Sequence, residues 1–354
     1  MGTRRIEFTF NQAVAIHNHW PAVPAMTSNR TLSLIATMWV ALALSTGVTR
    51  PFAQPSTETQ YAGMAEASAA AMLDNRHFVV AEDECNTLLV YEFGKPRPVA
   101  QPVDLAGFLE TGDKASDIEG GARVGDMIYW ISSHSLPKSG KPRDWRRRFF
   151  ATKVDASAPV PTVRPHGRAY AGLLEDMIAA PQLRDLKLGA AAQVVAEQID
   201  GLNIEGLAAW KTDGLLIGFR GPLIAGRAPL VPFKNPAAVV SGGRAGFEKP
   251  ILLDLGGRGI RSIDRVKSHY LIVAGPVGDV GTFAIYRWNG QPADPPVLQV
   301  QLNSGAVAPE ALLPVPTSKE VTLLSDDGSS QAEAACGTDA KAQQRFRALQ
   351  VRLP

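Results

Sequence analysis

The sequence lacks the motifs that identify several common classes of enzyme. It contains no Gly-x-Ser-x-Gly elbow, no Gly-x4-Gly-Lys phosphate loop, and no His-Glu-x-x-His or Cys-x-x-Cys metal motif. Only two of its 354 residues are cysteine, and only one apolar run approaches the length of a membrane span. These absences argue against the familiar serine hydrolases, phosphate-loop proteins and zinc sites, so other patterns must indicate the function.

The one long apolar run, Thr31–Val48, has the features of a secretory signal peptide. It follows a basic residue and precedes the small residue Ala53, so the three parts of a signal occur in order. We predict that residues 1–53 are a signal peptide, with residues 1–25 an upstream mis-assigned start. The mature protein would then be periplasmic or secreted, with no stable membrane span. The alternative is a permanent anchor, although the run is short for one.

The mature chain carries almost no net charge. Without residues 1–53 it keeps 32 Lys and Arg and 33 Asp and Glu, a formal charge of −1. Because nucleic-acid binding normally requires a basic surplus, we expect no nucleic-acid partner. Four arginines within residues 143–148 fit either a solvated loop or a site for an anion. The two cysteines, Cys85 and Cys336, fit either a disulfide or two free thiols.

Short strand-like runs separated by Gly, Pro and Asp follow a predicted linker at residues 54–63. The clearest runs are His77–Ala81, Thr87–Tyr91, Met127–Ile131, Leu215–Phe219, Tyr270–Ala274, Thr282–Trp288 and Glu320–Leu324. Many short strands between turn residues predict an all-β sandwich, barrel or propeller. Residues 170–199 have a helix-favouring composition and predict a short helical insertion.

A short phrase recurs before five strand-like runs. It reads AEAS at residues 65–68, IEGGA at 118–122, IEGLA at 204–208, IRSI at 260–263 and PEAL at 309–312. The residues in its second position are 53, 86, 56 and 49 apart, and the longest gap contains the helical insertion. Periods of about 40 to 50 residues are typical of propeller blades. Dividing the mature length by this period predicts a monomeric β-propeller of six or seven blades over residues 64–354.

The repeated phrase also predicts a ring of polar side chains at one mouth of the propeller. In an antiparallel hairpin, residues whose numbers have a constant sum face one another. The pairs that satisfy this rule about a turn-like segment are Glu66 with Asp83, Glu119 with His134, Glu205 with Arg220, Arg261 with Gly275, and Glu310 with Asp326. Equivalent strand ends lie at the same mouth, so these pairs would form a ring. Ring closure would also bring Cys85 close to Cys336.

At these residues the chain resembles a bacterial family of unknown function, domain of unknown function 3616. The resemblance rests on DIEGGARVGDMIYWISSHS (117–135), NIEGLA with LLIGFRGPL (203–223), LDLGGRGIRSI (253–263) and LLSDDG (323–328). It covers about residues 64–354 and implies a propeller but no activity. More remotely, the Glu-Gly-x-Ala phrase is similar to the esterase-like phytase propellers. Arg261 stands where the other repeats have Glu, so the resemblance does not imply a uniform carboxylate ring.

The oxygen donors at this mouth are the candidate functional site. Hard cations such as calcium take six to eight oxygen ligands, and without a cation only arginines could hold so many carboxylates ionised. The predicted calcium ligands are Glu66, Asp83, Glu119, Glu205, Glu310 and Asp326. The predicted ligand-binding ring consists of Glu119, His134, Glu205, Arg220, Arg261, Glu310 and Asp326.

Three functions fit this pattern, and the sequence leaves open whether the protein is an enzyme. The first is a calcium-assisted hydrolase of phosphate or other anionic esters, in which Arg220 and Arg261 hold the anion. The second is a non-catalytic propeller that binds an anionic ligand or an envelope protein. The third is a structural propeller whose charged pairs only tie blades together. Ser133 and His134 do not form a nucleophile–base pair, because adjacent strand residues point to opposite faces.

Overall fold

The computed structural model describes residues 57–302, 307–315, 318–332 and 334–354. The predicted signal peptide therefore lies outside the described residues. Within them, twenty strands form five antiparallel sheets of four strands each. None of the helices among these residues has the length and apolar character needed to cross a membrane.

Four of the sheets, called blades I to IV here, follow the chain in order. Blade I contains β2 (Ala67–Met72), β3 (His77–Glu82), β4 (Thr87–Glu92) and β5 (Val103–Asp104). Blade II contains β6 (Ile118–Val124), β7 (Met127–Ser132), β8 (Phe149–Asp155) and β9 (Thr162–Tyr170). Blade III contains β10 (Asn203–Trp210), β11 (Gly214–Gly221), β12 (Ala228–Phe233) and β13 (Ile251–Leu253). Blade IV contains β14 (Gly259–Val266), β15 (His269–Gly275), β16 (Phe283–Trp288) and β17 (Val297–Leu302).

Blade V joins the two ends of the described chain. It contains β18 (Pro309–Pro314), β19 (Glu320–Ser325) and β20 (Arg345–Arg352), with β1 (Thr57–Ala62) as its outermost strand. The register of β1 on β20 runs from Thr57 opposite Gln350 to Ala62 opposite Arg345. Residues 57–62, which the sequence assigned to a linker, are therefore a strand of the sheet, because β20 offers a free edge that they pair with.

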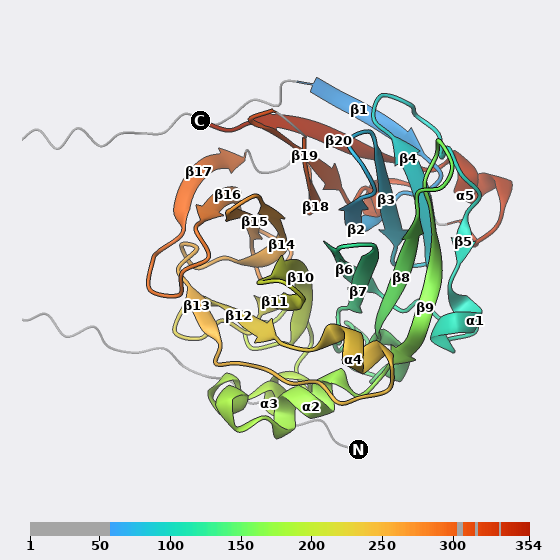
Figure 1. Cartoon of the computed structure of the whole chain (residues 1–354). Helices are drawn as coiled ribbons and strands as arrows, with labels where there is room; N and C mark the ends of the chain where they lie inside the picture. The colour runs from blue at the N-terminus through green and yellow to red at the C-terminus, as the bar shows by residue number, and fades with distance from the viewer. Residues whose placement is uncertain (1–56, 303–306, 316–317, 333) are drawn as a thin grey trace, which may run out of the picture. The chain divides into compact units, whose positions relative to one another are not determined.

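The five blades form a β-propeller. The innermost strands β2, β6, β10, β14 and β18 each contact the next, and β18 contacts β2 to close the ring (Figure 1). The predicted all-β propeller is confirmed, but the prediction of six or seven blades is wrong. Each of the five recurring phrases marks one blade, and insertions and long connections between strands account for the length that the prediction assigned to further blades.

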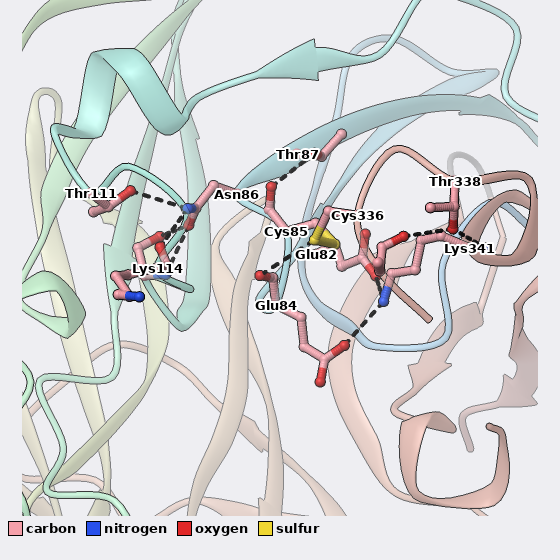
Figure 2. The surroundings of a disulfide bond; sticks show 12 residues. Glu82, Glu84, Cys85, Asn86, Thr87, Thr111, Lys114, Cys336, Thr338 and Lys341 are labelled. Atoms are coloured by element: carbon pink, nitrogen blue, oxygen red, sulfur yellow. Dashed lines mark hydrogen bonds and ion pairs between the residues drawn. A yellow bond between two sulfur atoms is a disulfide. The ribbon is translucent and has the colours of Figure 1, made fainter. Parts of the chain in front are cut away.

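A disulfide closes the ring a second time. Cys85, in the turn between β3 and β4, bonds Cys336, which precedes the short helix α5 (Asp339–Gln343) (Figure 2). Their Cα atoms lie 5.5 Å apart although 251 residues separate them in sequence. The predicted proximity of the two cysteines is confirmed, and of the two alternatives left open by the sequence the structure has the bonded one.

The core consists of five apolar clusters, one between each pair of neighbouring blades. Because both faces of a blade are covered, its second strand is a continuous apolar run rather than an alternating one. In β11, for example, only Arg220 is not fully buried. Such apolar runs can be identified in the sequence. Each of the seven strand-like runs predicted above coincides with a strand to within two residues at either end.

The predicted helical insertion lies between blades II and III. It consists of α2 (Leu173–Ala179), the 3-10 helix η2 (Pro181–Leu186) and α3 (Leu188–Ala191). Its apolar side chains are buried in the cluster between these two blades, so the insertion covers their outer part. The other helices in the described residues are short: α1 (Ala106–Leu109), η1 (Asp144–Arg146), α4 (Pro236–Val240) and η3 (Gly328–Ser330).

Every blade has a β-bulge near the start of its innermost strand. The register of the first hairpin shifts by one residue at the same point in each blade, which leaves one extra residue on the innermost strand. The extra residues are Ser68, Glu119, Glu205, Arg261 and Glu310. A bulge takes a residue out of the ladder and re-aims its side chain. We call the end of the propeller axis marked by these five residues the bulge mouth, and the opposite end, where the innermost strands turn back, the turn mouth.

Candidate functional site

The charged side chains at the bulge mouth fall into two groups. Glu205, Arg220, Arg261 and Glu310 are joined by ion pairs and are called the ion-paired half. The carboxylates of the acidic half are Glu66, Asp83, Asp117, Glu119 and Asp326, which raise one another's pKa through their charges. The first group neutralises itself, whereas the second has more negative than positive charge.

Glu205 is the centre of the ion-paired half, and it is only 3% exposed. Arg220 Nη1 donates to Glu205 Oε1 at 3.0 Å, so the predicted contact between these two residues is confirmed. They are not directly opposed, however. Ile204 pairs with Phe219 and Asn203 pairs with Gly221, so Glu205 and Arg220 are both extra residues beside the ladder. The two bulges bring the side chains together.

Arg261 crosses from blade IV to the carboxylates of both neighbouring blades. Its Nε and Nη1 lie 3.0 and 3.2 Å from the two oxygens of Glu205, and its Nη2 pairs with Glu310. The absence of a side chain at Gly275 makes room for it, because a Cβ there would lie 2.8 Å from Arg261 Cγ. Arg220 donates its remaining N–H groups to the carbonyls of Pro276 and Gly278. Both arginines therefore face carboxylates or carbonyls of the protein, although Arg261 Nε, 3.0 Å from Glu205 Oε2, does not have hydrogen-bond geometry.

In the acidic half, Asp83, Asp117 and Glu119 each place an oxygen within 4.8 Å of the other two. Asp83 directly follows β3 of blade I, and Asp117 and Glu119 lie at the start of β6 of blade II; the two blades are neighbours in the ring. Oδ1 of Asp83 and Oε2 of the adjacent Glu66 are buried and have no hydrogen-bond partner among the described residues. Three converging carboxylates, with an unpartnered oxygen on Asp83 and another on the neighbouring Glu66, are the kind of donors that an oxygen-preferring cation requires.

Asp117 is held by one cation and two hydroxyl groups. Arg146 Nη2 lies 2.9 Å from Asp117 Oδ1, and Ser133 donates to Oδ2. Arg146 also donates to Ser135 Oγ at 3.2 Å. Its Nε is buried and has no hydrogen-bond partner among the described residues. Arg146 thus has a buried donor that is available to a ligand, as does Arg261, whose Nε faces Glu205 at 3.0 Å but also lacks a hydrogen-bond partner among the described residues.

The protonation of the acidic half reflects burial and mutual repulsion. Burial, and then the charges of Glu66 and Asp117, raise the pKa of Asp83 well above its ordinary value. Burial and the charges of Glu310 and Asp117 do the same to the pKa of Glu119. Burial raises the pKa of Glu66 to about 7. A bound cation would reverse these shifts, because it favours the ionised carboxylates.

Two predicted members of the ring occupy other places. His134 is buried at 1% exposure, and its Nδ1 lies 2.8 Å from the carbonyl oxygen of Ser132. Burial lowers the pKa of His134 to about 4. The equivalent of Arg220 in blade II is Ser133, because the bulge at Glu119 shifts the register by one residue. Glu66 lies two residues before the bulge of blade I, where it bridges to Asp326 of blade V.

The disulfide lies beside the acidic half. Figure 2 shows Lys341 of α5 pointing toward Glu84, to which its Nζ is 3.1 Å distant. Lys341 also pairs with Glu82, and both of these side chains are almost fully buried. Glu84 and Lys341 both act on the pKa of Glu66, in opposite directions. The segment tied down by Cys336 therefore sets part of the charge around the candidate site.

One family model matches part of the chain. The family model described as "Protein of unknown function (DUF3616)" matches residues 175–346. This match agrees with the resemblance found in the sequence, while the remote similarity to esterase-like phytases stays a prediction. A search of curated proteins found no match.

Several solved structures are similar to the chain at low identity. Glutaminyl cyclase from Myxococcus xanthus is 11% identical, with a TM-score of 0.43 over 85% of this chain and 97% of that one. The PQQ-bound aldose sugar dehydrogenase from Streptomyces coelicolor is 13% identical, with a TM-score of 0.40 over 85% and 99%. An exo-beta-1,3-galactanase from Phanerochaete chrysosporium is 6% identical, with a TM-score of 0.43 over 84% and 67%. At these scores the likeness carries no argument about function.

Sequence reasoning missed two residues of this mouth, Asp117 and Asn203, and gave Arg146 only as one of four arginines that fit either a solvated loop or a site for an anion. Asp117 and Asn203 both stand two residues before the bulge residue of their blade, the place that Glu66 has in blade I. Asn203 Nδ2 donates to Glu205 Oε1 at 2.8 Å. Aligning the five phrases on the bulge would have placed these residues in one column. Arg146 is on a long loop outside the repeat, and no repeated pattern marks it.

Proposed function

We propose that the bulge mouth binds an oxygen-preferring divalent cation, of which calcium is the expected one. The observation that carries this proposal is the convergence of Asp83, Asp117 and Glu119 to within 4.8 Å. The unsatisfied buried oxygens beside them support it, since each can take part in coordination without breaking an existing hydrogen bond. Glu205 and Glu310, which the sequence offered as further ligands, are left out because Arg261 already holds both.

The bound cation would hold an anionic ligand, such as a phosphate or another anionic ester. Three carboxylates leave coordination positions free for ligand oxygens. The donor that supports this role is Arg146, which has a buried N–H without a hydrogen-bond partner and lies beside Asp117; Arg220 and Arg261 instead face Glu205 and Glu310. If the ligand is an ester, the cation would polarise it toward attack by water. If the protein is an enzyme, its proposed activity is therefore calcium-dependent hydrolysis of an anionic ester.

The second candidate is a non-catalytic propeller that binds an anionic ligand or an envelope protein at the same mouth. It is favoured by the position of the histidine nearest the site. His134 contacts the Ser132 carbonyl, and burial holds its pKa at about 4, so it does not form a base for Ser133. For either function we propose export to the periplasm or the medium, which the Cys85–Cys336 disulfide supports because such bonds persist in oxidising compartments.

Calorimetric titration of the purified protein with calcium tests the proposal. Glu119→Gln removes one ligand and also relieves repulsion, so the variant should be at least as stable as the native protein without calcium. It should bind calcium at least about tenfold more weakly, as expected for loss of a ligand. Asp213→Asn, in an exposed turn away from the site, is the matched control and should bind normally. Failure of the native protein to bind calcium, or normal binding by Glu119→Gln, would overturn the proposal.

A panel of phosphate and carboxylate esters then separates the two candidates. Calcium-dependent hydrolysis that Glu119→Gln loses would support the enzyme. Binding of an ester with no turnover would support the non-catalytic propeller.

A further inference from the structure

The turn mouth contains a cavity of about 840 Å³, at the other end of the propeller axis from the carboxylates. Residues from the innermost strands of all five blades, or from the turns that follow these strands, line it. Its size falls within the range of about 300 to 1,000 Å³ that is usual for sites of small organic ligands. The acidic half of the bulge mouth contributes no residue to this lining, so the cavity is a separate feature.

The cavity contains cations that have no acidic partner. Arg123 is partly buried and donates to the carbonyls of Met72, Leu73 and Gly125, without an ion pair to any described residue. Burial lowers the pKa of this guanidinium, and the charges of Asp74 and Asp126 offset the effect only in part, so the positive charge is incompletely compensated. Lys267 and Lys319 are exposed at the rim, and neither side chain has a hydrogen bond or ion pair among the described residues.

Three acids line the cavity, and two of them, Asp74 and Asp264, are engaged by backbone groups, whereas Glu320 follows Lys319 directly in the sequence. Asp74 accepts N–H groups from Arg76 and His77, and its second oxygen lies 2.8 Å from His77 Nδ1. Asp264 accepts the N–H of Arg265 at 2.6 Å, and burial raises its pKa to about 7, so near neutral pH this group is only partly charged. The lining contains four arginine or lysine side chains and three acidic ones, Asp74, Asp264 and Glu320. Its formal excess of one positive charge is increased by the partial protonation of Asp264 near neutral pH.

The inner wall of the cavity is apolar and made of small side chains. Ala70, Ala71, Ala209, Leu271 and Val321 line it. Small residues on the innermost strands leave the volume open, and their carbon atoms would contact an apolar part of a ligand. A cavity with an apolar wall and a cationic rim fits a molecule with an apolar body and one negative group.

We propose that the turn mouth is a second binding site, which takes an organic anion with an apolar body, such as a medium-chain or aromatic carboxylate or sulfonate. The anionic group contacts Arg123, Lys267 and Lys319, and the apolar body lies against the alanines of β2 and β10. This site is independent of the cation proposed for the bulge mouth, since it uses different residues at the opposite end of the innermost strands.

The test is a fluorescence titration of the folded protein with 1-anilinonaphthalene-8-sulfonate, an aromatic sulfonate that becomes fluorescent in apolar surroundings. The expected result is saturable binding that decanoate displaces and inorganic phosphate does not. The double variant Lys267→Met, Lys319→Met should bind the probe about tenfold more weakly, because it removes two exposed charge contacts. Ala209→Phe should weaken binding further by filling the cavity. Near-ultraviolet circular dichroism must show that both variants are folded.

Two controls locate the site. Lys249→Met removes an exposed lysine outside the cavity and should bind the probe like the native protein. Glu119→Gln, at the bulge mouth, should also bind it normally. The proposal is overturned if the native protein does not bind the probe, if the double lysine variant binds as tightly as Lys249→Met, or if Glu119→Gln alone abolishes binding.

Discussion

Glu205→Gln should destabilise the protein more than any single change at an exposed ion pair. The native carboxylate is 3% exposed and receives N–H groups from Arg220, Arg261 and Asn203. The formal charges of the ion-paired half sum to zero, so removing Glu205 leaves two arginines with Glu310 as the one carboxylate of the group, and burial raises the pKa of Glu310 to about 8. Breaking a buried pair in this way typically costs about 3 to 5 kcal/mol. We expect a loss of this size in the free energy of unfolding, measured by urea denaturation at neutral pH.

Adding Arg220→Met to Glu205→Gln should restore part of the stability, because the quartet is neutral again. The recovery is incomplete, since the carbonyls of Pro276 and Gly278 lose their donors. A coupling energy of about 1 to 3 kcal/mol is expected from the double-mutant cycle. Glu248→Gln is the control, because its pair with Lys211 at 3.1 Å is exposed and should contribute less than about 1 kcal/mol. A loss below about 1 kcal/mol for Glu205→Gln would refute the reasoning.

Three further changes have predictable effects. Reduction of the Cys85–Cys336 bond, which closes a loop of 251 residues, should lower the unfolding free energy by up to about 5 kcal/mol; an unchanged melting temperature in reductant would contradict this. Gly275→Ala should lower the unfolding free energy by about 1 to 3 kcal/mol, because the added Cβ would overlap with Arg261 and Phe283. Gly107→Ala is the control and should be neutral, since the space around its Cβ is open. Equal effects of the two changes on stability would refute the packing argument. Burial raises the pKa of Asp264 to about 7, so as the pH rises this carboxyl ionises in the unfolded chain before it does in the folded protein. The unfolding free energy should therefore fall by at most about 4 kcal/mol between pH 4 and 7. An unchanged pH profile of stability in Asp264→Asn would contradict this assignment.

The propeller fold could be predicted because every blade contains the same short sequence phrase followed by an apolar strand. The second strand of each blade is buried on both faces, so runs such as Tyr270–Ala274 are apolar throughout and easy to recognise. The number of blades could not be obtained by dividing length by period. The insertion at residues 171–202 and the long connections lengthen single blades without adding new ones, and the composition of a loop does not reveal its architectural role.

The contacts within the site depend on the positions of β-bulges, which could not be predicted from the residue types. A bulge adds one residue to one strand, which is why the constant-sum rule paired Glu119 with His134 instead of Ser133. The same rule found the contact of Glu205 with Arg220 only because bulges on both strands compensate. The position of β1 was missed for another reason. TETQYA has few apolar residues, and it becomes a strand because β20 offers it an unpaired edge.

The placement of β1 has a consequence for the order in which the molecule is assembled. Synthesis from the N-terminus produces β1 (Thr57–Ala62) before every other described strand, whereas its partner β20, which ends at Arg352, is produced last. Until then β1 has no edge to pair with, and the finished blades I to IV have a gap between them that only the end of the chain fills. A protein that lacked residues 57–62 would present the edge of β20 to other chains. A synthetic peptide of those residues, or the same strand from a second copy, could then insert there by β-strand addition.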